Sequence, residues 1–150
     1  MDDLQALNKR ILGHSGTPND NIETVLGLIS VCLGKLKPSG QELSDFIGQL
    51  AHQSNENSLD VVSINKDFLQ FARQTARDVT SGYFDGLIIL NIDFAQARVL
   101  ARLTNQQITD VSRRWNGLIF EAAGATSLQV QRLHESAAPH YSVALLAAAA

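Results

Sequence analysis

The sequence lacks the cysteines, apolar segments and excess positive charge that are typical of secreted proteins, membrane-spanning proteins and proteins that bind DNA mainly by charge. It contains a single cysteine, Cys32, so no disulfide can form within the chain. Lysine and arginine number 12 against 15 acidic residues, and the net charge of -3 excludes a protein that holds DNA by charge alone. No apolar run is long enough to span a membrane, and the N-terminus begins with Asp2 and Asp3 instead of the basic and apolar segments of a signal peptide. We therefore expect a cytoplasmic protein without a membrane partner.

The motifs of common enzymes and metal sites are also missing from the sequence. It has no glycine-rich phosphate loop, no His-Glu-x-x-His, no Gly-x-Ser-x-Gly and no cysteine placed beside a histidine. We therefore expect that the protein is not an enzyme and has no cofactor or metal of its own. Cys32 lies within an apolar pattern, which indicates a small core residue.

Helical patterning dominates what the sequence does contain. Hydrophobic residues make up 45% of the chain. They recur at three- and four-residue steps, which predicts an all-α fold, a helical bundle with one sizeable core. Ser39 and Glu42 form a capping box, and Pro38 ends the helix before it. We expect helices over residues 2–12, 22–37, 39–50, 59–81 and 127–135, and the stripe of the second includes Ile29, Cys32, Leu33 and Leu36.

A polar run over residues 52–58 is the best candidate for a domain boundary, because it indicates a solvated connection. We therefore expect an N-terminal helical extension over residues 1–56 and a helical core over residues 57–138. The alanine-rich residues 139–150 are predicted to form a tail.

Residues 93–115 predict a helix-turn-helix-like pair in the C-terminal half. Asp93 with Gln96 and Thr104 with Gln107 are two capping boxes, so two short helices follow each other through almost no loop. The first should bury Phe94, Ala97, Val99, Leu100 and Ala101, and the second Ile108, Val111 and Trp115. The segment is basic within an acidic chain, and we predict DNA contacts from Arg102, Asn105, Gln106, Thr109, Arg113 and Arg114.

Packing alone is the alternative interpretation of this pair, because most such pairs touch no DNA. Arg113 and Arg114 in particular lie near the end of the second helix, where they could offset the negative end of its dipole instead of meeting phosphates.

The predicted helix over residues 59–81 carries two adjoining apolar rows, which is more apolar surface than packing against a single neighbouring helix requires. The rows are Val61, Phe68, Ala72, Thr75 and Val79, and Val62, Leu69, Ala76 and Tyr83. We therefore predict a homodimer or higher oligomer whose interface includes Val61, Phe68, Leu69, Ala72 and Ala76. Burial of both rows in a single core is the simpler alternative.

From Ile64 to about Phe120 the chain resembles the FlhD family, the smaller subunit of the bacterial flagellar master activator. Ile64-Asn65, Phe68-Leu69 and Ala72-Arg73 are similar to the family's Ile-Asn-x-x-aromatic-Leu-x-x-Ala-Gln pattern. The run from Leu100 to Gln107 is similar to its Leu-Ala-x-Leu-Thr-x-x-Gln run. The chain departs from the family in its N-terminal extension and in Phe120, near where the family often has a cysteine, so the inter-subunit disulfide is not carried over.

The resemblance implies an α-helical transcriptional activator subunit that dimerises and acts with a larger, zinc-binding FlhC-like partner. The complex would bind promoter DNA and recruit RNA polymerase, and the zinc would belong to the partner. Relatives of this activator switch on either flagellar genes or conjugative transfer genes, and the sequence does not choose between them. The alternative from another class is a helical adaptor or secretion chaperone that binds no DNA.

Overall fold

A computed structural model of the chain describes residues 3–14 and 29–122, which are mostly helical. Their β structure is a two-stranded sheet in which β1 (Lys35–Leu36) pairs with β2 (Phe120–Glu121). The predicted all-α class is therefore confirmed. The chain divides into two compact units, residues 1–35 with 122–150 and residues 36–121. The predicted helix over residues 127–135 and the predicted tail lie outside the described residues.

Helix α1 (Asp3–His14) confirms the first predicted helix. It buries three apolar side chains together with the polar Asn8. The Asn8 side chain donates a hydrogen bond to the carbonyl of Val31 at 2.9 Å and accepts one from the amide of Leu33 at 2.8 Å. These bonds tie α1 to the segment that leads into β1.

The predicted helix over residues 22–37 is wrong where the structure describes it. Residues 29–37 form bends and the strand β1, and the earlier part of that helix lies outside the described residues. The apolar residues of the stripe are nevertheless buried, namely Ile29, Cys32, Leu33 and Leu36. Burial raises the pKa of the Cys32 thiol to about 12, so the thiol is protonated at neutral pH and packs as an apolar group.

The helical spacing of the apolar residues gave a wrong prediction for residues 29–37, because backbone amides there bond to partners far away in the sequence. The amide of Leu33 donates to Asn8, and the amide of Lys37 donates to the carbonyl of Ile119 at 2.9 Å. In a helix these amides would bond to carbonyls four residues earlier. A local pattern of apolar residues contains no information about such distant partners.

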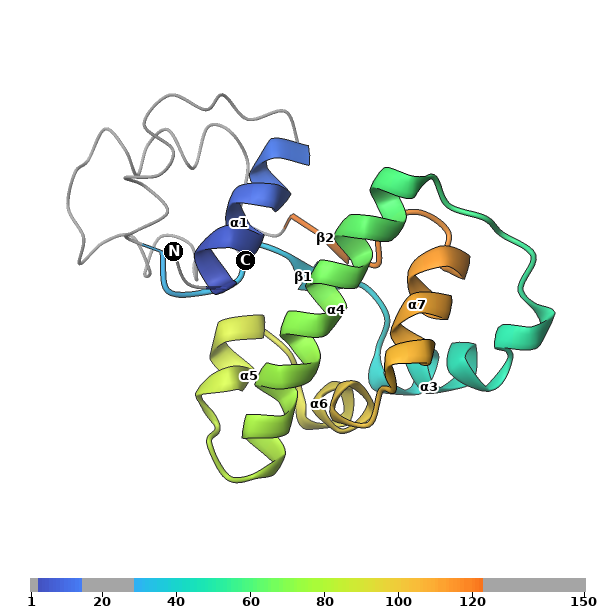
Figure 1. The fold of residues 1–150 in the computed structure, drawn as a ribbon. Coiled ribbons are helices and arrows are strands. Elements are labelled where there is room, and N and C mark those ends of the chain that lie inside the picture. The colour runs from blue at the N-terminus through green and yellow to red at the C-terminus, as the bar shows by residue number, and fades with distance from the viewer. Residues whose placement is uncertain (1–2, 15–28, 123–150) are drawn as a thin grey trace. The chain divides into compact units, whose positions relative to one another are not determined.

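The long helix α4 (Leu59–Thr80) is the centre of the unit of residues 36–121. Helices α5 (Asp85–Leu90), α6 (Phe94–Ala101) and α7 (Asn105–Arg114) all pack against it, while α3 (Gly40–Gly48) packs against α6. The 3₁₀ turn η1 (Leu50–His52) follows α3 and contacts α7. Figure 1 shows α7 beside the first half of α4 and α5 beside its last turns.

Helix α4 confirms the long helix that the sequence predicts, with Ser58 capping its N-terminus. Most of the apolar side chains in the middle of α4 pack inside the chain. Phe68 is 1% exposed and stacks on Phe120 with ring centroids 4.7 Å apart, and Leu69, Ala72 and Ala76 are fully buried. These four residues lie in the core of the chain, as the single-core alternative expects, and the predicted oligomer interface stays a prediction. Of that set, Val61 is half-buried.

The predicted domain boundary near residue 56 falls inside the unit of residues 36–121. Residues 53–58 do connect two helices without forming one, as predicted. They are, however, bonded to the end of α7, and α3 packs on α6. The segment before α4 therefore belongs to the same compact unit as the helix-turn-helix-like pair.

Candidate nucleic-acid interface

Helices α6 and α7 are held at their N-termini by the two predicted capping boxes. The Asp93 carboxylate accepts from the amide of Gln96 at 2.8 Å, and the Gln96 side-chain oxygen accepts from the amide of Asp93 at 3.0 Å. The Thr104 hydroxyl accepts from the amide of Gln107 at 3.0 Å, and the Gln107 side-chain oxygen accepts from the amide of Thr104 at 2.9 Å. These bonds satisfy N-terminal amides that would otherwise lack partners, and they fix where each helix begins.

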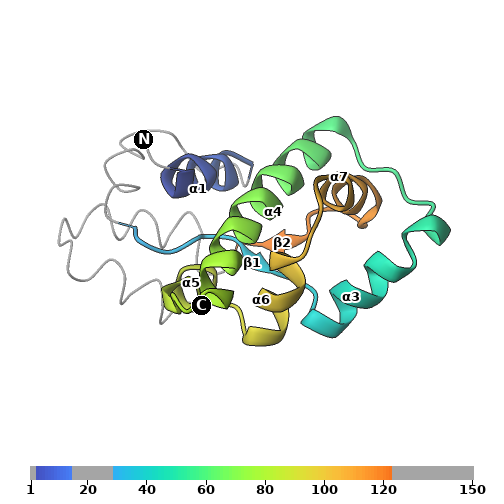
Figure 2. The ribbon, with the colours of Figure 1, turned by 60° about the horizontal axis from the view of Figure 1, so that its bottom comes forward.

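The two helices cross steeply. In Figure 1 helix α6 is seen nearly along its axis while α7 lies across the view, and in Figure 2 the two have exchanged roles. Residues 102–104 alone separate them. A steep crossing through a turn this short is the geometry of a helix-turn-helix unit.

Helix α7 divides into a buried side and an open side. Ile108, Val111 and Ser112 are buried, and α7 packs against α4. Asn105 and Gln106 in its first turn are exposed, and the Gln106 amide donates to Asp110 at 3.0 Å. The predicted contact residue Thr109 is half-buried. The first turn therefore presents amide side chains to solvent, as the sequence predicts.

The other end of α7 is less open than the sequence suggests, because Glu56 pairs with both arginines there. One oxygen of the Glu56 carboxylate accepts from Arg113 at 3.0 Å, and the other accepts from Arg114 at 2.7 Å. Arg114 also donates to the carbonyl of Asn55 at 3.2 Å. Both arginines thus have partners within the chain, and Glu56 and the end of the helix offset part of their charge.

Three asparagines to which sequence analysis assigned no structural role position the chain at this end of α7. The Asn57 side chain donates to the carbonyls of Ser112 and Trp115 and accepts from the amide of Gly117 at 3.1 Å. Asn55 donates to Trp115, and the buried Asn65 donates to the carbonyl of Gly117. Their partners lie more than fifty residues further along the chain, so local motifs carry no signal for them.

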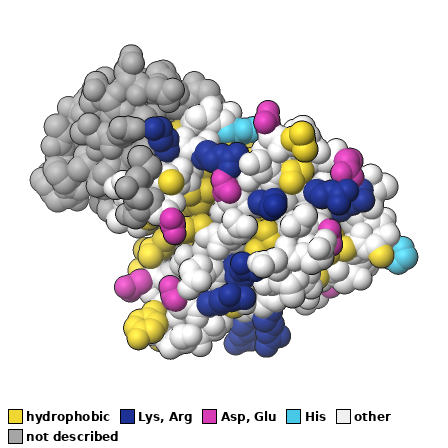
Figure 3. Space-filling model, in the orientation of Figure 1, with side chains coloured by type: hydrophobic (Ala, Val, Ile, Leu, Met, Phe, Trp, Pro, Cys, Tyr) yellow, Lys and Arg dark blue, Asp and Glu magenta, His cyan; other side chains and the backbone are white. Residues whose placement is uncertain are grey.

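Two arginines lie at the C-terminal end of α6, Arg98 within the helix and Arg102 directly after it. Arg98 and Arg102 are exposed, and neither has a hydrogen bond from its side chain or an ion-pair partner among residues 3–14 and 29–122. Arg73 and Arg77 of α4, in contrast, donate to the carbonyls of Leu103 and Ala101 at the end of α6. Figure 3 shows Lys and Arg side chains gathered at the lower edge of the view, where α6 lies. Sequence analysis singled out Arg102 but not Arg98.

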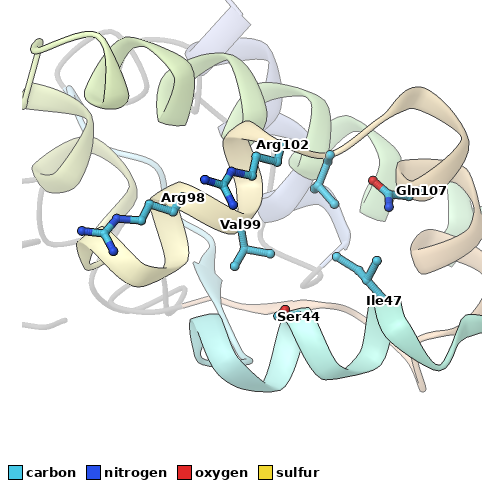
Figure 4. A pocket seen from close by; sticks show the side chains of 7 residues that line it. Ser44, Ile47, Arg98, Val99, Arg102 and Gln107 are labelled. Carbon is cyan, nitrogen blue, oxygen red and sulfur yellow. The ribbon is translucent and has the colours of Figure 1, made fainter.

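A pocket of about 190 Å³ lies beside these arginines, between α3, α6 and the start of α7. Figure 4 shows Arg98 and Arg102 on one side of it, Ile47 and Gln107 on the other, and Ser44 on α3. The capping box uses the side-chain oxygen of Gln107, which leaves its amide nitrogen able to donate. The two guanidinium groups point away from Gln107 in Figure 4, toward solvent, where guanidinium groups suit a phosphate.

Phe94 departs from the predicted inner side of α6, since it is 48% exposed. Ala97 and Leu100 are buried and Val99 and Ala101 are half-buried, in agreement with the prediction. Phe94 follows its N-cap directly, and its ring meets that of Phe84 on the surface.

No group of three or more His, Cys, Asp or Glu residues within the described part of the chain is arranged to hold a metal ion. Among the same residues, no helix has both the length and the apolar character needed to cross a membrane. Comparisons of the chain with protein-family models, with curated proteins and with solved structures found no significant match.

Proposed function

We propose that this chain is a DNA-contacting subunit of a transcriptional activator, in which the α6–α7 pair meets promoter DNA. The observation that carries the proposal is the steep, doubly capped helix pair with exposed amides on α7 and exposed arginines at the end of α6. In such units the start of the second helix enters the major groove, and the first helix lies across the backbone.

The two parts of this surface suit different parts of DNA. The side chains of Asn105 and Gln106 carry both a donor and an acceptor, which is the combination that the major-groove edge of adenine offers. Arg98 and Arg102 suit phosphate oxygens, which fix the position of a protein on DNA without specifying sequence. We therefore assign the amides to recognition and the α6 arginines to the backbone.

An acidic chain with a net charge of -3 needs a partner for tight binding, because phosphate contacts supply much of the affinity for DNA. We propose that this partner is the larger, zinc-binding FlhC-like subunit that the family resemblance implies. Recruitment of RNA polymerase, and the choice between flagellar and conjugative transfer genes, would then be properties of the complex.

The first prediction tests the α6 arginines. Changing Arg98 and Arg102 together to alanine should lower promoter affinity about equally for all sequences and reduce the slope of log affinity against log salt by about two. The unfolding free energy should hardly change, since both side chains are exposed. Chromatin immunoprecipitation of the tagged chain in its host supplies the promoter fragment, and fluorescence anisotropy over a salt series measures binding by the purified complex.

The matched control changes Arg113 and Arg114 together to alanine, which removes the same charge from side chains that Glu56 already binds. Its salt slope should fall by less than about one. Equal slopes for wild type and the Arg98/Arg102 variant, in a complex that still assembles, would assign the DNA surface to the partner.

A second candidate function, the helical adaptor or secretion chaperone, is favoured by one observation. Large apolar side chains are exposed around α5, among them Tyr83 at 73% and Ile88 at 71%. Such side chains often mark contacts with other proteins. The adaptor predicts that immunoprecipitation enriches no DNA, whereas the activator subunit predicts a defined set of promoters.

A further inference from the structure

Four large exposed hydrophobic side chains lie between the end of α4 and the start of α6, and we call them the α5 patch. Its members are Tyr83, Phe84, Ile88 and Phe94, with exposed fractions of 73%, 57%, 71% and 48%. The rings of Phe84 and Phe94 meet edge to face with centroids 5.7 Å apart, which joins the two helix starts. Ile88 follows Phe84 by four residues and so shares its side of α5.

The core of the protein does not require these side chains. The opposite side of α5 is the one that packs, since Gly86 and Leu90 are buried. A Cβ atom on Gly86 would lie 2.6 Å from the Val79 side chain, so α5 is already in close contact with α4. Single exposed hydrophobic residues such as Leu59 are ordinary on protein surfaces, but a cluster of four suggests a binding surface.

Acidic residues adjoin the α5 patch in the sequence. Residues 78–97 include the exposed acids Asp78, Asp85 and Asp93 and contain no lysine, arginine or histidine, although the exposed Arg77 and Arg98 flank this range and Arg98 lies one turn after Phe94. Asp85 and Asp93 directly adjoin Phe84 and Phe94 in the sequence. In Figure 3 acidic side chains lie beside hydrophobic ones at the lower left of the view. A partner that covers the apolar side chains therefore meets negative charge at their edge.

We propose that the α5 patch docks an amphipathic helix of a partner protein that carries lysine or arginine beside its apolar stripe. Apolar side chains at helical spacing would pack on Phe84, Ile88 and Phe94, and the basic side chains would face Asp85 and Asp93. A second copy of this chain fits less well, because a two-fold contact places the same patch against itself and brings these acids together. The inference does not depend on DNA binding by α6 and α7.

The second prediction tests this surface with a pair of synthetic helical peptides of about 18 residues. Both carry leucine at three- and four-residue spacing, and the remaining positions are lysine in one peptide and glutamate in the other. The lysine peptide should bind the full-length protein saturably and at least about tenfold more tightly than the glutamate peptide. Anisotropy of the dye-labelled peptides measures binding, and amide chemical shifts locate it on the protein.

Variants of the protein separate the apolar contribution from the charge. Ile88→Ser and Phe84→Ser should each weaken binding of the lysine peptide by about tenfold, since buried apolar anchors dominate such contacts. Leu59→Ser is the matched control, because Leu59 is 89% exposed at the start of α4 and lies outside the patch. Asp85→Asn should weaken binding a few-fold, whereas Asp45→Asn on the exposed side of α3 should not.

Several outcomes would overturn the proposal. They are the absence of saturable binding, equal binding of the two peptides, or equal losses in the Ile88→Ser and Leu59→Ser variants. Self-association in light scattering that Ile88→Ser abolishes and Leu59→Ser leaves intact would assign the patch to a second copy of the chain instead. Circular dichroism of each variant checks that the fold is unchanged.

Discussion

Asn65 is a buried polar residue whose hydrogen bonds join the middle of α4 to the chain beyond α7. Its side-chain amide donates to the carbonyls of Ser112 at 3.3 Å and Gly117 at 3.0 Å, and its oxygen accepts from the amide of Ile119 at 3.0 Å. Buried polar groups cost stability when they lack partners, and here the backbone supplies them. The asparagine that contributes to the family resemblance therefore has a structural role in this fold.

The third prediction contrasts two buried polar residues at this junction. Asn65→Ala should lower the free energy of unfolding by about 3 kcal/mol, because it leaves the buried amide of Ile119 without its partner and removes the nearer of two donors to the carbonyl of Gly117. Ser112→Ala should change it by less than about 1 kcal/mol, or raise it, since the Ser112 hydroxyl is buried and has no hydrogen-bond partner among the described residues. Urea denaturation measures both, and similar losses in the two variants would contradict this assignment.

Two glycines allow the helices of the larger unit to pack closely. A Cβ atom on Gly40 would lie 2.7 Å from the backbone carbon of Ala95, where α3 meets α6. A Cβ atom on Gly86 would lie 2.6 Å from the Val79 side chain and 3.0 Å from the carbonyl oxygen of Thr75, where α5 meets α4. Both contacts include backbone, which cannot move aside as a flexible side chain does. The positions of α3 and α5 therefore depend on these residues.

The fourth prediction tests these close contacts with one substitution at three positions. Gly40→Ala and Gly86→Ala should each destabilise the protein by about 1–3 kcal/mol, because the added methyl group forces the helices apart. Gly48→Ala should stabilise it by about 0.5 kcal/mol, since Gly48 ends α3 with no atom near its missing Cβ, and alanine favours helix. Thermal and urea denaturation give the order, and a stabilising Gly86→Ala change would refute the packing argument.

The helix starts could be predicted because capping is a local signal. Ser39, Asp93 and Thr104 each form the full capping box that the sequence indicates, and α3, α6 and α7 begin where expected. The stripe through Ile29 and Leu36 predicted burial correctly and helix wrongly, because its backbone partners are distant in the sequence. Local sequence patterns therefore predict where capped helices begin. They fail where hydrogen bonds to distant residues determine the backbone conformation.

The candidate site could be predicted only in part, for the same reason. Asn105 and Gln106 are exposed as expected, since the first turn of α7 follows from its cap. Arg113 and Arg114 are occupied by Glu56, which lies more than fifty residues earlier in the chain. No motif within α7 reveals that pairing. Arg98 becomes a candidate phosphate contact only when the structure shows that it lines the same pocket as Gln107 at the start of α7.

The long helix α4 supplies much of the core of the unit of residues 36–121. Seven residues of α4 are buried, and α5, α6 and α7 pack against the helix. Oligomerisation remains a prediction. Any dimer has to use surface outside the buried Phe68, Leu69, Ala72 and Ala76, and the half-buried Val61 lies at the start of that helix.

The fifth prediction separates core from interface along α4. Leu69→Asp should unfold the protein, because Leu69 is fully buried and an unpaired buried charge costs several kcal/mol. Val61→Asp should leave the fold intact, since Val61 is half-buried in the first turn of α4, where an acidic side chain suits the helix dipole. Circular dichroism reports folding and light scattering reports the oligomeric state. A folded Leu69→Asp monomer would restore the interface interpretation of that row.

The position of Trp115 gives the molecule a natural optical reporter. It is the chain's only tryptophan, and it ends α7 with its ring 5.0 Å from that of Phe46 on α3. Asn55 and Asn57 both donate to its carbonyl, so α3, α7 and the connection before α4 all converge on this one residue. The emission of an indole ring shifts to longer wavelength when the ring becomes exposed to water. The tryptophan fluorescence of this protein therefore arises from one place in the fold, and a shift in its wavelength reports displacement of the C-terminal end of α7 without any added label.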